Sequence, residues 1–376
     1  MRNCESYLIE DMETLQQVAD YWINKGPWSI TYYNTKAASG DPHDYYSESP
    51  YWWPDPDDPE AAYIRKDGLR NPNRFMEHKN ALLEMYGAVT ALSIAGYFFD
   101  NRSYADRAVE LISIWFLNED TRMNPHLSYA QAILNKSPGR GVGIIDTHRF
   151  VKLIEAINLL RMTNRLTDDQ NRLLKDWFSE YLYWLTHSKN GLKEKFQGNN
   201  HSSWWGAQVA SYARFSEKYN VMDSIWTYYR EYLVPNQISA KGNFPQEDVR
   251  TLSLDYSFFN LDAHSFICKM AYLRGVDLWS YQISKNIGIK NSIDYLFPFF
   301  VEPDNWPREQ IKPVVRIGRV FPVFAGLSLN NRDYLEGYAE INKTYAEERE
   351  IGMIDPFVLL LNLMTKFHLV KNRVSN

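Results

Sequence analysis

The sequence has little cysteine and no concentrated positive charge, and both shortages exclude classes of protein. Its two cysteines, Cys4 and Cys268, lie far apart, so neither a disulfide framework nor a cysteine-rich zinc site is indicated. No run of lysine and arginine suggests nucleic-acid binding, and the net charge of −5 gives no long-range attraction for a polyanion. Any acidic ligand must therefore be held by a local basic patch.

Motifs for metals and phosphates are also lacking. The eight histidines form no His-Glu-x-x-His pair, and no Asp-rich calcium loop is present. Neither a Gly-rich phosphate loop after a strand nor a Gly-x-Ser-x-Gly elbow occurs. We therefore expect no metal and no cofactor, and the metalloenzyme, kinase and serine hydrolase classes are disfavoured.

Targeting signals are weak as well. The N-terminus lacks the apolar core of a signal peptide, and no uninterrupted apolar stretch has the length of a membrane span. The chain as written is expected to be cytoplasmic, or secreted or periplasmic if a leader was removed. Association with a membrane is not indicated, and no obligate protein partner is evident.

Helical periodicity dominates what is present. A series of helical pairs without a fixed repeat predicts an all-α fold, an α/α toroid in which hairpins form an incomplete barrel with long cleft-side loops. A repeat solenoid is the alternative. We expect one domain over residues 1–376. The predicted helices cover residues 6–23, 82–99, 105–117, 148–162, 169–187, 202–216, 222–233, 256–273, 291–301, 331–349 and 356–370.

Three long segments, 34–74, 118–147 and 234–255, interrupt the helices and are rich in proline and glycine. Loops of this length in a compact helical protein are usually functional or disordered, and the aromatic residues of the first argue against disorder. Aromatic residues make up 15% of the chain, and flat rings suit both a core and a sugar-binding cleft. The first loop supplies the candidate sugar contacts Tyr45, Tyr46, Tyr51, Trp52 and Trp53.

The segment Asn199-Asn200-His201 opens a predicted helix, where the helix dipole favours an anion. Asn200 and His201 are candidate site residues, and Trp204 or Trp205 would lie on the same helix face as His201. The alternative, that Asn200 only caps the helix, is equally compatible with the spacing.

Arg250 and Tyr256 lie six residues apart, so a turn must separate them if both face one cleft. Asn260 shares a helix face with Tyr256, and Glu247 lies near the same motif, so both are candidate substrate contacts. The competing interpretation is a surface pair between Arg250 and Glu247, followed by an aromatic core helix.

Two further polar groups open long helices, His78-Lys79-Asn80 and His148-Arg149. Each could point into the same cleft. Helix capping and a surface ion pair explain them equally well.

Together these segments offer an amide, an imidazole, a guanidinium and a phenol. That set can neutralise a sugar carboxylate, remove the neighbouring proton and protonate a leaving oxygen. His201 and Tyr256 can divide the proton transfers, and the sequence leaves open which of them is the base.

The elements Asn-Asn-His-Ser-x-Trp, Arg-x-x-x-Leu-x-Tyr-Ser-x-Phe-Asn-Leu and Pro-Tyr-Trp-Trp-Pro resemble the alginate lyase superfamily, closest to polysaccharide lyase families 5 and 38. The resemblance spans about residues 30–330. It implies a helical toroid, neutralisation of the carboxylate by Asn200 with Arg250, a catalytic His201, and Tyr256 as proton donor. A lid-loop tyrosine would also contribute, and Tyr45, Tyr46 and Tyr51 are all candidates.

The expected function is therefore cleavage of an acidic polysaccharide or oligosaccharide, mannuronate-rich alginate or glucuronan, by β-elimination. One alternative is a glycoside hydrolase acting on acidic oligosaccharides, which would need two carboxylates across the cleft. The other is a non-catalytic carbohydrate-binding protein that uses the aromatic loop.

Overall fold

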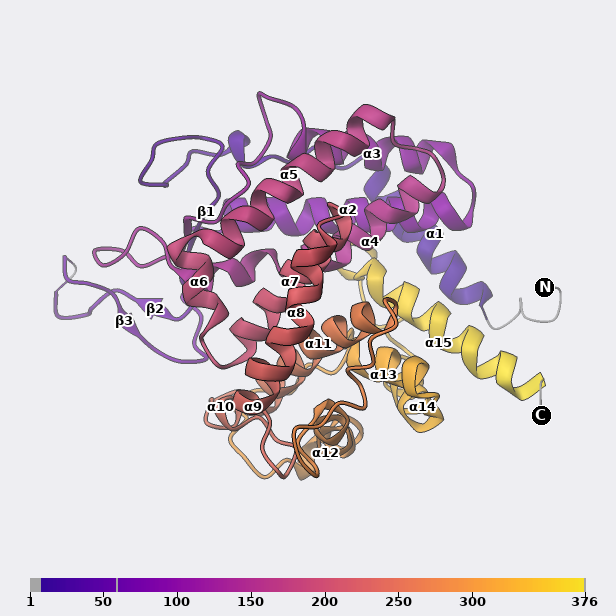
Figure 1. Cartoon of the computed structure of the whole chain (residues 1–376). Helices are drawn as coiled ribbons and strands as arrows, with labels where there is room; N and C mark the ends of the chain where they lie inside the picture. The colour runs from indigo at the N-terminus through magenta and orange to yellow at the C-terminus, as the bar shows by residue number, and fades with distance from the viewer. Residues whose placement is uncertain (1–7, 59, 375–376) are drawn as a thin grey trace.

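The computed structural model describes residues 8–58 and 60–374, and Cys4 and the start of the helix predicted over 6–23 lie outside this part. Most described residues are helical, as the periodicity predicts (Figure 1). The α-helices are α1 Ile9–Ile23, α2 Glu77–Phe98, α3 Arg102–Phe116, α4 Phe150–Met162, α5 Asp168–His187, α6 Lys189–Lys195, α7 Asn200–Phe215, α8 Tyr219–Tyr228, α9 Val234–Gln237, α10 Pro245–Asp248, α11 Ser253–Tyr272, α12 Ile289–Val301, α13 Phe321–Leu329, α14 Arg332–Ile341 and α15 Pro356–Val374.

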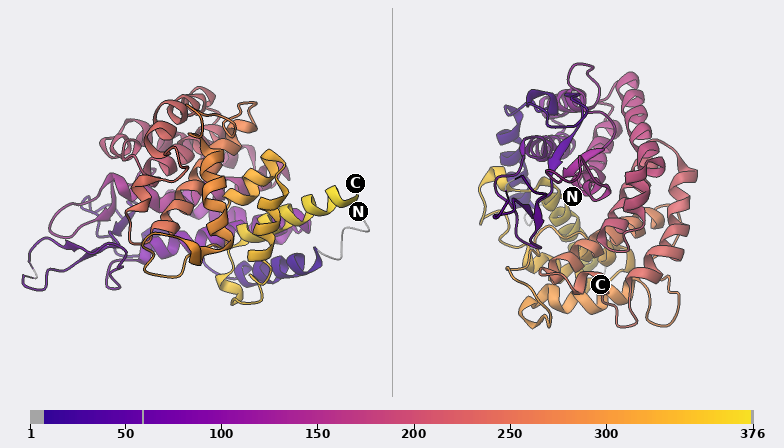
Figure 2. Two further views of the ribbon diagram at one scale, coloured as in Figure 1. Left: turned by 90° about the horizontal axis from the view of Figure 1, so that it is seen from below. Right: turned by 90° about the vertical axis from the view of Figure 1, so that its left-hand side faces the viewer.

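Successive helices pair through short turns and follow one another round an arc, which makes an incomplete α/α toroid (Figure 2). The packed neighbours include α2 with α3, α13 with α14, and α7 with both α8 and α11. Short connections force neighbouring helices to run antiparallel, so apolar faces of adjacent pairs meet. The predicted fold class is confirmed.

Helices α2 and α7 are buried on nearly every side. α2 is long and apolar enough to span a membrane by composition, but 78% of its most apolar window is buried inside the fold, as in a core helix. α7 lies between α5 and α11. A helix enclosed in this way has no solvent-facing stripe, and its polar side chains must find partners inside the protein.

The described part of the chain has four short strands, all in the non-helical segments. β1 (Tyr46–Glu48) pairs in parallel with β4 (Tyr129–Ala132), and β2 (Trp52–Trp53) pairs antiparallel with β3 (Ile64–Arg65). The β2–β3 pair projects from the helices on the side away from the two termini (Figure 1). The first two non-helical segments, 34–74 and 118–147, are thus mainly loops held in place by short strands.

The predicted helix boundaries differ from the structure at several points. The helix predicted over 331–349 ends at Ile341, because the side chain of Asn342 turns back to donate to the carbonyl of Tyr338. The short helices α6, α10 and α13 were not predicted. Each contains glycine or proline, and such residues lower the helical signal of a sequence window.

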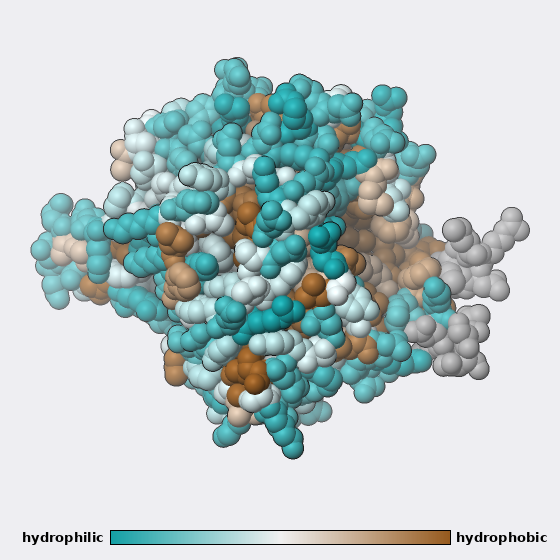
Figure 3. All heavy atoms as spheres, viewed as in Figure 1, coloured by the Kyte–Doolittle hydropathy of each residue, from teal (hydrophilic) through white to brown (hydrophobic). Residues whose placement is uncertain are grey.

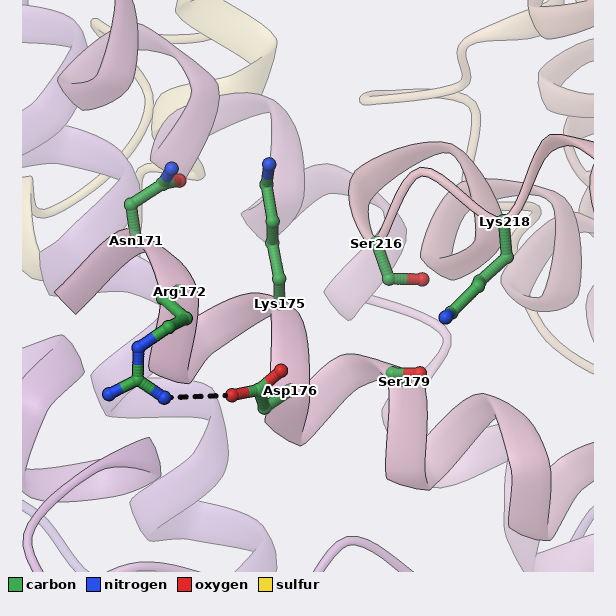
Figure 4. A pocket seen from close by; sticks show the side chains of 7 residues that line it. All are labelled: Asn171, Arg172, Lys175, Asp176, Ser179, Ser216 and Lys218. Carbon is green, nitrogen blue, oxygen red and sulfur yellow. Dashed lines mark hydrogen bonds and ion pairs between the residues drawn. The ribbon is translucent and has the colours of Figure 1, made fainter. Parts of the chain in front are cut away.

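Two hollows lie away from the first turn of α7. A polar pocket of about 240 Å³ lies beside Ser216, at the opposite end of α7, and Figure 4 shows Arg172 paired with Asp176 in it. An apolar groove of about 640 Å³ lies between α1, the end of α2 and α15. Apolar side chains gather near α15 on the otherwise largely hydrophilic face in Figure 3.

Thr167 caps α5, because its hydroxyl accepts from the Gln170 N–H and the Gln170 side chain accepts from the Thr167 N–H. We expect Thr167→Ala to lower the free energy of unfolding by about 1 kcal/mol, the usual effect of losing such a cap. Urea denaturation measures the change, and Thr167→Ser is the control that keeps the hydroxyl. Equal stability of the Ala variant and the wild type would show that the cap contributes nothing.

Candidate active site

The first turn of α7 is built around a buried carboxylate. Asn199 is the N-cap, and its side chain accepts from the His201 N–H. Glu247 of α10 accepts from the Asn200 N–H at 2.7 Å and from Asn200 Nδ2 at 2.9 and 3.0 Å. The anion that the helix N-terminus favours is therefore supplied by the protein itself.

This arrangement changes the expected role of Asn200. Its side chain amide donates to Glu247, and the residue is only 1% exposed. The alternative interpretation of Glu247 as a surface partner of Arg250 is wrong, because Glu247 is fully buried. Asn200 and Glu247 form an internal pair that fixes the start of α7 against α10.

His201 is held by a second buried carboxylate. Its Nδ1 lies 2.6 Å from Oε1 of Glu194 on α6, while its side chain remains 20% exposed. Helix α6 can pack this closely because Gly191 has no Cβ. A Cβ at this position would lie 2.0 Å from the Leu185 carbonyl oxygen. With Nδ1 donating to Glu194, Nε2 is the ring nitrogen left for a ligand.

The charge of His201 follows from this pairing. Burial alone would lower its pKa, but the carboxylate of Glu194, assisted by Glu247, raises the pKa above the ordinary histidine value. For Glu194 burial has the opposite sign. It raises the pKa of the carboxyl group, and His201 offsets only part of that rise. The imidazolium form of His201 is therefore favoured over a wider pH range than in a free histidine.

Arg250 and Tyr256 meet in spite of their separation in sequence, because the chain turns before α11 begins at Ser253. The Arg250 guanidinium lies 3.8 Å from the centroid of the Tyr256 ring. Its Nε and Nη2 donate to Asp67, in the loop after β3, at 3.1 and 2.9 Å. Asp67 orients Arg250 over the phenol, and 16% of the Arg250 side chain stays exposed.

The first loop adds another phenol. The hydroxyl of Tyr51 lies 2.8 Å from that of Tyr256, and the two share a hydrogen bond. Burial, followed by the neighbouring Tyr51, raises the pKa of Tyr256 well above the usual value, and Arg250 opposes that rise. Tyr256 therefore holds its proton in the resting protein.

Of the three candidate loop tyrosines, Tyr51 is the one in contact with Tyr256. Tyr45 is fully buried and its hydroxyl donates to Asp146 at 3.3 Å. The buried Tyr46 donates to Glu48 at 3.2 Å. The predicted substrate contacts of Tyr45 and Tyr46 are wrong, because both phenols serve to anchor the loop.

Asp146 collects donors from several segments. Lys79 donates to it at 2.8 Å, Ser47 at 2.6 Å and Gln131 at 3.3 Å. Although burial alone would raise the pKa of Asp146, Lys79 and these hydrogen bonds lower it. Lys79 thus ties α2 to the loops, and the neighbouring Asn80 is exposed.

The structure places two of the three predicted histidines, His78 and His148, in packing positions. His78 is fully buried, its Nδ1 accepts from the Tyr46 N–H, and burial lowers its pKa to about 4. The prediction that His78 contacts the substrate is wrong. His148 packs edge-on against Trp204 and Phe259, and burial lowers its pKa to about 3.

Four other residues predicted to contact the substrate have partners within the protein. Arg149 forms an ion pair with Asp355, as the ion-pair interpretation of the His148-Arg149 segment expects. Trp204 and Trp205 are buried and donate to backbone carbonyls. Asn260 is fully buried and donates to Gln237. Burial removes Trp204, Trp205 and Asn260 from direct contact with a substrate.

Trp52 and Trp53 are half-buried on the β2–β3 pair. Lys136 Nζ lies 4.5 Å from the ring centroid of Trp52, and Lys66 Nζ lies 5.2 Å from that of Trp53. Cations thus cover part of the rings expected to stack on sugars. The hairpin region therefore combines apolar rings with the basic groups of Lys66 and Lys136, and such cations attract carboxylates.

Residues that position the site were missed from the sequence. Glu194 and Asp67 gave no motif, because each acts through a partner that is distant in the chain or on another element. Glu194 could have been noted as an acidic residue just before a predicted helix N-terminus. Asp67 carries no comparable signal.

The comparisons with known proteins can now be set beside this geometry. The sequence profile named alginate lyase matches residues 30–306. The crystal structure of an alginate lyase from Bacteroides ovatus is 31% identical, with a TM-score of 0.85 over 95% of this chain and 94% of that chain. The chain belongs to the alginate lyase family. It is a polysaccharide lyase.

A more distant structure shares the fold. A variant of alginate lyase A1-III complexed with a tetrasaccharide is 14% identical, with a TM-score of 0.52, and the match covers 82% of this chain and 84% of that chain. Alginate lyase A1-III from Sphingomonas species A1 is 15% identical, with a TM-score of 0.49 over 85% and 84% of the two chains. Among curated proteins no sequence matches.

The Glu194–His201 pair gives a direct test of the lyase site. We expect Glu194→Gln to move the titration midpoint of His201 to lower pH, because burial then acts without the opposing carboxylate. NMR of the imidazole protons measures the midpoint, with His201→Gln used for assignment. Turnover should fall about 10-fold or more, as for other lost supporting carboxylates.

The exposed Glu180 on α5 provides the control, because Glu180→Gln removes the same charge elsewhere. An unchanged His201 midpoint in folded Glu194→Gln protein would mean that Glu194 does not set the charge of the imidazole.

Proposed function

We propose that the protein cleaves mannuronate-rich alginate or glucuronan by β-elimination and leaves a 4,5-unsaturated uronate at the new end. The observation that carries the proposal is the convergence of a histidine held by a carboxylate, an arginine and a protonated tyrosine. Similarity to alginate lyases supports alginate as a substrate.

His201 and Arg250 bind the carboxylate at the cleavage position. Both retain exposed atoms, and the charges of Arg250 and Glu247 influence the pKa of His201, which supports a shared site. A uronate is ionised at neutral pH, and removal of H5 adds a second negative charge beside it. Two cations preorganised around the developing enolate stabilise it more than they stabilise the ground state.

Tyr256 performs both proton transfers. In β-D-mannuronate and β-D-glucuronate, H5 and O4 lie on one side of the ring, so one phenol oxygen can reach both. Tyr256 first gives up its own proton to solvent. Its phenolate then takes H5, the C4–C5 double bond forms and the C4–O4 bond breaks. The leaving O4 receives the proton from Tyr256, which restores the phenolate. Arg250 over the ring opposes the rise in the Tyr256 pKa and so lowers the cost of forming the phenolate.

Asn200 has a supporting role in this proposal. Its amide and backbone N–H hold Glu247, and the Glu247 charge helps to keep His201 protonated. Loss of Asn200 would leave a buried carboxylate with fewer donors next to the site. Asn200 therefore acts through Glu247 and His201.

A panel of uronate polymers tests the function. We expect ultraviolet absorbance of unsaturated product to rise with mannuronan or glucuronan, and far more slowly with guluronan, in which H5 and O4 lie on opposite sides. A glycoside hydrolase would release reducing ends without that absorbance, and a binding protein would give neither signal. Fastest cleavage of guluronan would overturn the assignment of both transfers to Tyr256.

Replacement of the phenol tests its chemistry. We expect Tyr256→Phe to remain folded, because the hydroxyl contacts only the neighbouring Tyr51 among described side chains, and to lose about 10²-fold or more in kcat. Tyr51→Phe is the matched control, since it removes the other hydroxyl of the pair and should cost less. Near-normal turnover of Tyr256→Phe would assign proton transfer to another group.

A further inference from the structure

The segment Gly139-Arg140-Gly141 packs closely against neighbouring backbone. A Cβ on Gly139 would lie 2.1 Å from the Ser128 carbonyl oxygen, and one on Gly141 would lie 2.7 Å from that of Asn190. The Arg140 N–H also donates to the carbonyl of Ala130. Glycines at both neighbours allow this close approach and fix the point from which the Arg140 side chain leaves the backbone.

The Arg140 guanidinium is bound by neutral groups. Nε donates to the Gln131 carbonyl at 3.0 Å, and Nη2 donates to Ser49 Oγ at 2.6 Å and to Gln131 Oε1 at 3.5 Å. Within residues 8–58 and 60–374, no carboxylate lies within ion-pair distance of Arg140, although the side chain is partly buried. Burying an arginine without a carboxylate is unfavourable unless a ligand supplies the anion.

Arg140 lies between the two halves of the active site. Ser49, its hydrogen-bond partner, is two residues before Tyr51, which contacts Tyr256. On the other side, Gly141 packs against α6, which carries Glu194, the partner of His201. A sugar chain bound at Tyr256 and His201 would have its next residue near Arg140.

The surroundings of Arg140 are basic. Its guanidinium lies 5.8 Å from the ring centroid of Trp52, and Lys136 Nζ lies 4.5 Å from the same centroid. Burial and the charge of Arg65 lower the pKa of Arg140 to about 10, which the carboxylates of Glu194 and Asp146 only partly oppose. The positive charges near Arg140 are therefore only partly balanced by nearby carboxylates, as expected of a site that binds an anion.

The polar pocket in Figure 4 differs in this respect. Arg172 there is paired with Asp169 and Asp176, and Lys175 with Glu217. The two cations on α5, Arg172 and Lys175, thus have carboxylate partners, whereas Arg140 has none among the described residues.

We propose that Arg140, with Lys136 beside Trp52, binds the carboxylate of the uronate next to the one that is cleaved. Ser49 and Gln131 hold Nε and Nη2 in position, and among the described residues Nη1 has no hydrogen-bond acceptor, so Nη1 can donate to a carboxylate. This subsite rests on the proposed function in one respect, namely that the substrate carries a carboxylate on consecutive sugars.

Binding without turnover tests the subsite. Titration calorimetry of a mannuronate hexasaccharide would use the Tyr256→Phe protein and the same protein with Arg140→Gln. We expect the second to bind about tenfold or more weakly, the usual loss for a hydrogen bond to a charged group. Arg172→Gln in the same background is the control for loss of one positive charge and should leave binding unchanged.

A carboxyl-reduced hexasaccharide separates recognition from structure. It should bind Arg140→Gln and the parent protein with equal affinity, because the group that Arg140 recognises has been removed. An equal loss of affinity for both sugars, or no loss for either, would overturn the inference. Thermal unfolding of each variant confirms that the comparison is made on folded protein.

Lys136→Gln provides a second route if Arg140→Gln does not fold, because Lys136 is exposed. We expect weaker binding of the mannuronate sugar and a shallower salt dependence, and unchanged binding would contradict the proposal. The cleavage assay on the polymer panel gives a result that is independent of this binding experiment. Loss of affinity in Arg140→Gln with no unsaturated product would reject the proposed cleavage alone, and cleavage with normal Arg140→Gln binding would reject the subsite alone.

Discussion

The ion pair between Glu194 and His201 is the contact on which the rest of the active site depends. A carboxylate that is fully buried needs a cation or several donors, since an isolated buried charge is strongly unfavourable. His201 meets that need at 2.6 Å, and the same contact fixes its ring orientation and its charge. Because Glu194 belongs to α6 and His201 to α7, the turn between these two helices sets the position of the imidazole.

The same principle operates twice more around the pair. Glu247 holds Asn200 at the start of α7, and Asp67 holds Arg250 over Tyr256. Each carboxylate comes from a segment other than that of its partner, so the site forms only when the toroid and its loops are assembled. The Tyr51–Tyr256 hydrogen bond then joins the first loop to α11. In the proposed reaction, substrate groups would meet cations that are already oriented, which lowers the reorganisation needed.

The sequence predicts the helical fold well, because apolar periodicity in α3, α5 and α14 directly reflects which face is buried. It also offers His201, Arg250 and Tyr256 as candidates, because their side chains carry recognisable chemistry, and the structure brings Arg250 and Tyr256 into contact. It fails for Trp204, Trp205 and Asn260, since α7 and α11 are buried all round and helix-face arguments cannot tell a core face from a substrate face. Glu194, Asp67 and Arg140 depend on contacts between distant segments, which periodicity and local spacing do not encode.

The central claim is that a uronate carboxylate lies between His201 and Arg250 while Tyr256 faces both C5 and O4. A crystal structure of Tyr256→Phe protein with a mannuronate tetrasaccharide tests it most directly. The account predicts a carboxylate within hydrogen-bond distance of His201 Nε2 and the Arg250 guanidinium, with H5 and O4 of that sugar directed at the ring of residue 256. A carboxylate bound away from both cations, or C5 directed at His201 with O4 on the opposite side, would contradict it.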